Sequence, residues 1–129
     1  MHRTKYVITN REYGTELVDG AITQINGLWF GFTKCWKYKK RGHSQYSYYR
    51  ATELTTGMLV TNGDDEFLTR AEAVQFCRSV TDDVYEVLNS NKEHVDKLRK
   101  KVRKRYEAEG MTDMIDRIYG NGSKGKKKG

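Results

Sequence analysis

The sequence predicts an α+β fold: an antiparallel meander sheet of three to five strands comes first, one capped helix packs on it, and a long basic helix and a short helix follow. Three observations predict this order. β-branched and aromatic residues dominate the N-terminal half. The segments between them are too short for crossover connections, so neighbouring strands must be antiparallel. From Thr69 onward, apolar residues recur at the spacing of a helix.

The first two strands are set off by turn residues. Thr4 to Thr9 is β-branched and aromatic, which predicts a first strand. Glu16 to Ile25 is a weaker strand candidate, because Asp19-Gly20 interrupts it. Asn26-Gly27 then predicts a tight hairpin turn, since these residue types accept the left-handed backbone conformations that such a turn needs.

The segment from Leu28 to Tyr38 has the clearest strand pattern in the chain. Its large apolar side chains alternate onto one face: Leu28, Phe30, Phe32, Trp36 and Tyr38. Lys34 breaks the alternation, which predicts an edge position or a bulge. We expect Phe30, Phe32 and Trp36 to pack in the core.

Two further strands and a capped helix complete the first part of the chain. A basic loop leads to a tyrosine-rich strand from Gln45 to Leu54, and Met58 to Thr61 predicts the last strand. Thr69-Arg70-Ala71-Glu72 is a capping box, which predicts the start of the first helix. The apolar positions that follow predict that this helix lies on the sheet.

A second helix is expected to begin at Thr81-Asp82-Asp83 and to continue to about Gly110. Its apolar positions repeat every seven residues, and a seam of this kind needs a partner helix, so we expect a homo-oligomer. The seam consists of Leu88, Asn91, Val95, Leu98 and Val102. Met111 to Tyr119 predicts a short helix. The chain thus divides into a sheet with its first helix (1–80), a helical extension for oligomerisation or binding (81–119) and a disordered basic tail (120–129).

The densest charge lies in the second helix, where seven of the nine residues from Lys97 to Arg105 are Lys or Arg. Leu98 and Val102 stand four apart, so the helix can pack by one stripe and present cations elsewhere. A solvated helix face is the alternative interpretation, but like charges at this density repel unless an anionic partner or the rest of the fold compensates. The candidate phosphate-binding residues are these cations and those of the loop before the fourth strand: Lys97, Arg99, Lys100, Lys101, Arg103, Lys104, Arg105, Lys39, Lys40 and Arg41.

Aromatic residues interleave with the basic loop. Exposed rings beside cations are what stacking on nucleic-acid bases requires. We expect Trp29, Tyr48 and Tyr49 to stack on a ligand, because they alternate to the face opposite the core or flank it. Core packing is the alternative for these rings as well.

No segment carries a catalytic or metal-binding signature. The three histidines are scattered, and Asp64-Asp65-Glu66 lacks helper ligands and is interpreted as a solvated loop. We therefore expect no enzymatic activity, no cofactor and no metal. Cys35 and Cys77 are interpreted as buried free thiols, because no secretory signal precedes them. No apolar run approaches the roughly 20 residues of a membrane span, so we expect a cytoplasmic protein without membrane contact.

The net charge of +7 and the basic helix predict a small binding protein for a phosphate-rich partner, nucleic acid above all. Two alternatives remain open. One is an oligomeric, phage-type counter-defence protein that sequesters a small phosphorylated nucleotide in pockets between subunits. The other is a protein-binding inhibitor of an enzyme that handles nucleic acid.

Overall fold

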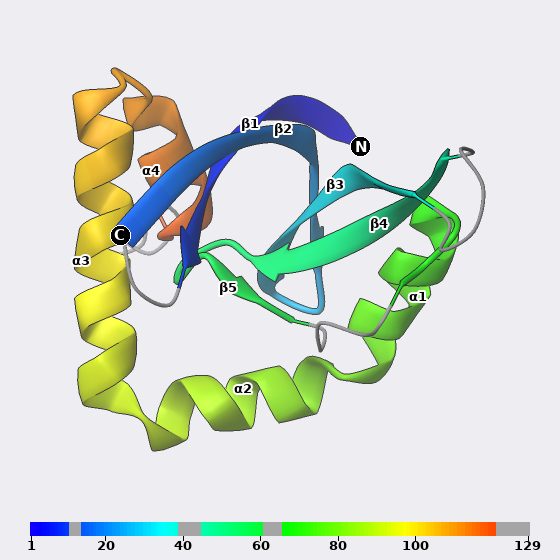
Figure 1. Ribbon diagram of the computed structural model, residues 1–129. Coiled ribbons are helices and arrows are strands. Elements are labelled where there is room, and N and C mark those ends of the chain that lie inside the picture. Colours follow the sequence, from blue (N-terminus) through cyan, green and yellow to red (C-terminus); the bar gives the residue numbers. More distant parts are fainter. Residues whose placement is uncertain (11–13, 39–44, 61–65, 121–129) are drawn as a thin grey trace.

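One antiparallel sheet forms the N-terminal part of the chain, and helices border it (Figure 1). The structure is a computed structural model that describes residues 1–10, 14–38, 45–60 and 66–120. In these residues five strands lie side by side in chain order, which confirms the predicted α+β fold. The strands are β1 (His2–Asn10), β2 (Gly14–Ile25), β3 (Leu28–Tyr38), β4 (Gln45–Glu53) and β5 (Met58–Leu59). The helices are α1 (Arg70–Ser79), α2 (Thr81–Ser90), α3 (Lys92–Ala108) and α4 (Thr112–Ile118).

The hairpin turn between β2 and β3 is the one predicted at Asn26-Gly27. Asn26 has φ of 52° and Gly27 has φ of 89°, both in the left-handed region. Two-residue turns with this backbone match the right-handed twist of the strands that they join. The turn therefore sets the register of β2 and β3, in which Ile25 lies opposite Leu28.

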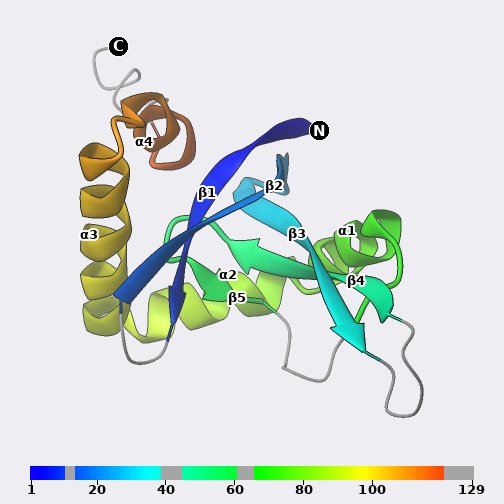
Figure 2. The same ribbon diagram turned by 45° about the horizontal axis from the view of Figure 1, so that its top comes forward.

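The sheet curls until its first strand reaches the turn between its last two (Figures 1 and 2). The Thr9 amide donates a hydrogen bond of 2.9 Å to the Gly57 carbonyl, and the Thr9 hydroxyl donates to the Thr56 carbonyl at 3.1 Å. Gly57 has φ of 72°, and a Cβ there would lie 2.8 Å from the Thr9 nitrogen. A glycine is thus required where β1 closes against this turn.

The second strand is continuous, so the expected interruption at Asp19-Gly20 is wrong. Gly20 gives room for the ring of Tyr6, since a Cβ at Gly20 would lie 2.9 Å from the Tyr6 Cε2 atom. Gly31 on β3 does the same, because its Cβ would lie 2.6 Å from Tyr6 Cζ. Tyr6 is fully buried and shares a hydrogen bond with the Thr33 hydroxyl, and this burial raises its pKa. The glycines therefore mark a packing site within two strands.

One core cluster lies between the sheet and α1 and extends to α2 and α3. Its buried members are Ile25, Leu28, Phe30, Phe32, Ala51, Ala73, Cys77, Leu88 and Val95. Phe30 and Phe32 are confirmed as core, but the expectation for Trp36 is wrong, because its side chain is 59% exposed. The cluster takes no residue of β3 beyond Phe32, so Trp36 continues the alternation past the part of the strand that the helices cover. Lys34 needs no bulge either: it lies in regular register opposite Tyr49.

The predicted start of α1 is confirmed by its hydrogen bonds. The Thr69 hydroxyl accepts a bond of 3.2 Å from the Glu72 amide. The Glu72 carboxylate in turn accepts a bond of 3.0 Å from the Leu68 amide. The box thus satisfies donors at the first turn of the helix that covers the sheet.

A second core cluster joins β1 and β2 to the two C-terminal helices. Its buried members are Tyr6, Val7, Ile22, Leu54, Val102, Tyr106, Met114 and Ile118. Helix α3 contributes to both clusters, through Val95 to the first and through Val102 and Tyr106 to the second. It therefore belongs to the same core as the sheet.

The long helix expected from residue 81 to about 110 is broken at Asn91. Asn91 has φ of −124° and ψ of 51°, which ends α2, and α3 continues in a different direction (Figure 1). No local pattern predicts this break, because Asn91 stands in phase with the apolar repeat on either side. Because of this break, three residues of the predicted seam pack against the sheet of their own chain. Leu88, Val95 and Val102 are 7%, 1% and 0% exposed. These three residues thus already have partners, whereas Asn91 is exposed and Leu98 half-buried.

Candidate phosphate-binding surface

Four of the five lysines of α3 lie together on its exposed side; Lys92, at the start of the helix, is the fifth. Successive residues of an α-helix are rotated by about 100°, which places all four within about 100° of arc, opposite Val95, Val102 and Tyr106. We call this set the lysine ridge: Lys97, Lys100, Lys101 and Lys104. All four are exposed, and none forms a hydrogen bond or ion pair with another residue of the described chain. The ridge therefore offers four ammonium groups to solvent.

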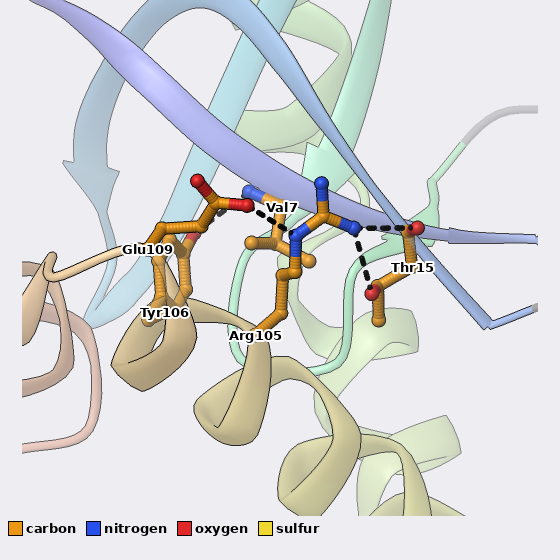
Figure 3. Close-up of polar contacts among 5 residues, drawn as sticks. All are labelled: Val7, Thr15, Arg105, Tyr106 and Glu109. Carbon is orange, nitrogen blue, oxygen red and sulfur yellow. Dashed lines mark hydrogen bonds and ion pairs between the residues drawn. The ribbon is translucent and has the colours of Figure 1, made fainter.

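The arginines of α3 flank the ridge and fasten the helix to its neighbours. The Arg105 Nε is 2.8 Å from Glu109 Oε2, and one of its terminal nitrogens donates to the Thr15 carbonyl at 2.9 Å (Figure 3). The Arg99 Nε donates to the Thr55 hydroxyl at 3.1 Å. The Arg103 guanidinium lies 4.5 Å from the centre of the Tyr119 ring. Three of the seven predicted phosphate-binding cations of α3 thus have structural partners, which lie in β2, in the turn between β4 and β5, just after α3 and at the end of α4.

Tyr106 fixes the same helix from its buried side. Its hydroxyl accepts a hydrogen bond of 2.9 Å from the amide of Val7 on β1 (Figure 3). Both residues are fully buried. Burial raises the pKa of Tyr106 to about 12, so the hydroxyl stays protonated at physiological pH. The ridge consequently stands on a helix that is held in one position.

Two depressions open on the two sides of the ridge. The larger, a groove of about 570 Å³, is lined by Arg99, Lys100 and Arg103 together with residues from four other segments. Its remaining lining residues are Gly27, Leu28, Thr55, Tyr85, Asp96, Ile118, Tyr119 and Gly120. The shallower depression, of about 380 Å³, is lined by Gly14, Thr15, Lys101, Lys104, Arg105 and Ala108. The groove combines cations with tyrosine rings, which the sequence did not indicate because Tyr85 and Tyr119 lie far from the basic run.

The three aromatic residues predicted to stack on a ligand, Trp29, Tyr48 and Tyr49, are buried or partly buried. Tyr48 is only 7% exposed, and the Arg50 guanidinium lies 5.7 Å from its ring centre. Trp29 packs against the second core cluster and Tyr49 against the first. Among the described residues, the exposed large rings are Trp36, at 59%, and Tyr85, at 39%. For Trp36, its place at the far end of a strand was the available signal.

The far end of the β3–β4 hairpin, which we call the hairpin arm, consists of the described residues 34–38 and 45–50. Its cations are engaged: Lys37 Nζ is 2.7 Å from Glu66 Oε2, and Lys34 Nζ lies 5.6 Å from the Trp36 ring. This contact with Lys37 lowers the pKa of the Glu66 carboxyl, and the hydrogen bond to Glu66 raises the pKa of Lys37. Lys39, Lys40 and Arg41 lie outside the described residues.

Helix α3 and the described part of the hairpin arm lie at opposite sides of the molecule. Helix α3 borders one side of the sheet, and the hairpin arm points away from it in both views (Figures 1 and 2). A ligand must be long to reach both. Asp64 and Asp65 of the acidic loop and residues 121–129 of the predicted tail (120–129) lie outside the described part of the chain, whereas Glu66 and Gly120 are described.

The described residues offer little to a metal or a nucleophile. They contain no group of three or more His, Cys, Asp or Glu side chains that could hold a metal ion. Cys35 and Cys77 are free thiols, Cys35 half-buried and Cys77 buried. Burial raises the pKa of Cys77 to about 12 and raises that of Cys35, so both are protonated at neutral pH. No helix in the described ranges has the length and apolar character needed to cross a membrane.

Comparison of the chain with protein-family models, with curated proteins and with solved structures found no match.

Proposed function

We propose that the protein binds nucleic acid through the lysine ridge, without chemistry of its own. The observation that carries the proposal is the sorting of the cations on α3. Its arginines hold the helix in place, whereas its lysines face solvent with no counter-ion among the described residues. A surface of this kind raises the local concentration of anions and attracts a polyanion above all.

The dimensions of the ridge suit a phosphate backbone. From Lys97 to Lys104 the helix rises by about 10 Å. Duplex DNA carries one charge per roughly 1.7 Å of its axis, so several phosphates lie within reach of the four ammonium groups. Binding of this kind positions a nucleic acid without reading its sequence, and we expect low sequence preference.

The salt dependence of DNA binding tests the proposal. Labelled duplex and single-stranded DNA are titrated with the protein at several salt concentrations. If all four lysines contact duplex phosphates, log K falls with log salt with a slope of roughly −3 to −4, which is about a 10²-fold loss between 50 and 200 mM. The variant K97Q/K100Q/K101Q/K104Q should lose most of this slope.

A matched variant controls for net charge. Arg3, Arg70, Arg78 and Arg117 are also exposed, but they lie on other elements, so R3Q/R70Q/R78Q/R117Q removes the same charge away from the ridge. It should retain most of the slope. Equal slopes for the two variants, or no binding of DNA or RNA by the folded protein, would overturn the proposal. In the second case an acidic protein partner becomes the hypothesis to pursue.

A further inference from the structure

The groove beside the ridge brings cations and rings from separate parts of the chain to one place. Arg99, Lys100 and Arg103 line it from α3, Tyr85 from α2, and Tyr119 from the end of α4. Its volume of about 570 Å³ lies within the range of small-molecule sites. The lining thus combines basic side chains of α3 with two tyrosines from other segments.

The first arginine of the groove is held by a buried network. The Thr55 hydroxyl accepts from Arg99 Nε at 3.1 Å and donates to Glu53 Oε2 at 2.7 Å. Glu53 is 2% exposed, and its carboxylate accepts three further bonds from the Thr55 amide and from the amide and hydroxyl of Thr56. The network engages only the Nε of Arg99 and leaves its two terminal amino groups available as a planar pair of donors.

The second arginine is held by a ring. The Arg103 guanidinium lies 4.5 Å from the centre of the Tyr119 ring, whose hydroxyl donates to the Thr55 carbonyl at 2.6 Å. Stacking occupies a face of the guanidinium and leaves its edge donors available. Two oriented guanidinium groups with Lys100 beside them fit a phosphate group, because bidentate arginine pairs favour such oxyanions.

The aromatic wall is formed by Tyr85, whose side chain is 39% exposed. Its hydroxyl donates to the Asn26 carbonyl at 2.9 Å, and Gly27 makes this approach possible, since a Cβ there would lie 2.6 Å from that hydroxyl. The ring is therefore fixed by its polar end. Asp96 also lines the groove and supplies an acceptor that suits a ribose hydroxyl or an amino group.

We propose that this groove binds one nucleoside phosphate, with the phosphate on Arg99, Lys100 and Arg103 and the base against Tyr85. The proposal deepens the proposed function, because the nucleotide can be the 5′-phosphorylated end of a strand or a free molecule. The expected alternative of a sequestered nucleotide placed the site between subunits, whereas this groove lies within one chain. Only Lys100 belongs to both the groove and the ridge, so the two can be tested separately.

Calorimetric titration of the full chain distinguishes the ligands. The probes are nucleoside 5′-monophosphates, the corresponding nucleosides, inorganic phosphate, and a trinucleotide with or without a 5′-phosphate. We expect one nucleotide or one phosphorylated trinucleotide bound per chain, at least tenfold more tightly than the nucleoside, phosphate or unphosphorylated trinucleotide. Tighter binding of the mononucleotide identifies a free ligand, and tighter binding of the trinucleotide identifies a strand end.

Variants separate the groove from the ridge. R99Q/R103Q should weaken nucleotide binding at least tenfold, and Tyr85→Leu should weaken the nucleotide but not inorganic phosphate. Arg103→Lys retains the charge and guards against loss of folding; it should also weaken the nucleotide. Lys97→Gln with Lys101→Gln should leave nucleotide binding unchanged while lowering the salt slope of duplex binding.

Two results would overturn the inference: no binding of any 5′-phosphorylated probe, or binding that Arg103→Lys and R99Q/R103Q leave unchanged in folded protein. If duplex binding still depends on the ridge, the proposed function stands without the groove. If duplex binding is absent while the nucleotide binds, the proposed function fails and the groove stands.

Discussion

Helix α3 and the hairpin arm are both rich in cations, but the structure uses them differently. On the arm, Lys37 pairs with Glu66 at 2.7 Å and Lys34 lies against a tryptophan ring. On α3, the four ridge lysines have no such neighbours in the described chain, because the arginines beside them make the structural contacts. The available charge of a basic segment therefore depends on which cations the fold itself engages, and a count along the sequence does not report it.

The largest expected difference in the free energy of unfolding is between substitutions in the covered and the uncovered parts of β3. Phe32 is 1% exposed and Trp36 is 59% exposed on the same face of the strand. We expect Phe32→Ala to lower the free energy of unfolding by about 3–5 kcal/mol. Trp36→Ala should cost less than about 1 kcal/mol, because its ring remains largely hydrated. Urea unfolding measures both, and equal losses would mean that the arm belongs to the core.

The next effect concerns the buried support of the ridge. Tyr106→Phe removes the acceptor of the buried Val7 amide, so we expect a loss of about 1–3 kcal/mol in the free energy of unfolding. Tyr85→Phe, which removes a hydrogen bond at an exposed residue, is the matched control and should lower the free energy of unfolding by less.

The raised pKa of Tyr106 predicts a pH dependence of stability. Between about pH 10 and pH 12 the wild type should lose stability, because the unfolded state ionises its tyrosines first and the folded pKa of Tyr106 is about 12. Thermal unfolding at pH 9 and 11 would show a smaller decrease for Tyr106→Phe.

A smaller effect distinguishes arginine from lysine within α3. Arg105→Met should lower the free energy of unfolding by about 1 kcal/mol, because it releases the bonds to Thr15 and Glu109. Lys101→Met should change it by less than about 0.5 kcal/mol. In duplex DNA affinity at low salt we expect the opposite order: Lys101→Met should weaken binding more than Arg105→Met. If Arg105→Met has the larger effect on both stability and DNA affinity, the division between structural arginines and ligand-binding lysines is contradicted.

The smallest effect tests the ion pair of the arm. Because the folded pKa of Glu66 lies below its ordinary value of 4.5, the pair stabilises the fold above that pH and loses its effect as pH falls through the lowered pKa. The difference in melting temperature between wild type and Glu66→Gln should therefore be present at pH 7 and vanish in acid. Glu66→Gln also releases Lys37 and should steepen the salt slope of DNA binding by one phosphate contact at most. A difference that persists at pH 3 would show that the pair is not its source.

The sequence predicted what local chemistry decides. The turn at Asn26-Gly27, the capping box at Thr69 and the order of the strands all follow from residues close together in the chain. The break at Asn91 was missed, because a polar residue in phase with an apolar repeat is also what a coiled-coil seam contains. Trp36 is exposed because the helices cover only part of β3, and no local sequence pattern predicts how far that cover extends.

The candidate site was predictable only in part. Plotting residues 97–105 at helical spacing separates the lysines from the buried face, so the ridge could have been found in the sequence. The engagement of Arg99, Arg103 and Arg105 could not, since their partners include Thr55, Tyr119 and Thr15, which the fold brings to α3. The groove was missed for the same reason.

The bond between Val7 and Tyr106 joins residues 99 positions apart. A ribosome adds about 5–20 residues per second, so the amide of Val7 waits roughly 5–20 s for its acceptor to be synthesised. Until then the first strand lacks the helix that completes its cluster, and its apolar residues stay accessible to chaperones or to other chains. Completion of the cluster around the first strand therefore depends on a residue synthesised 99 positions later, and conditions that slow translation should lengthen the period in which the nascent sheet can aggregate.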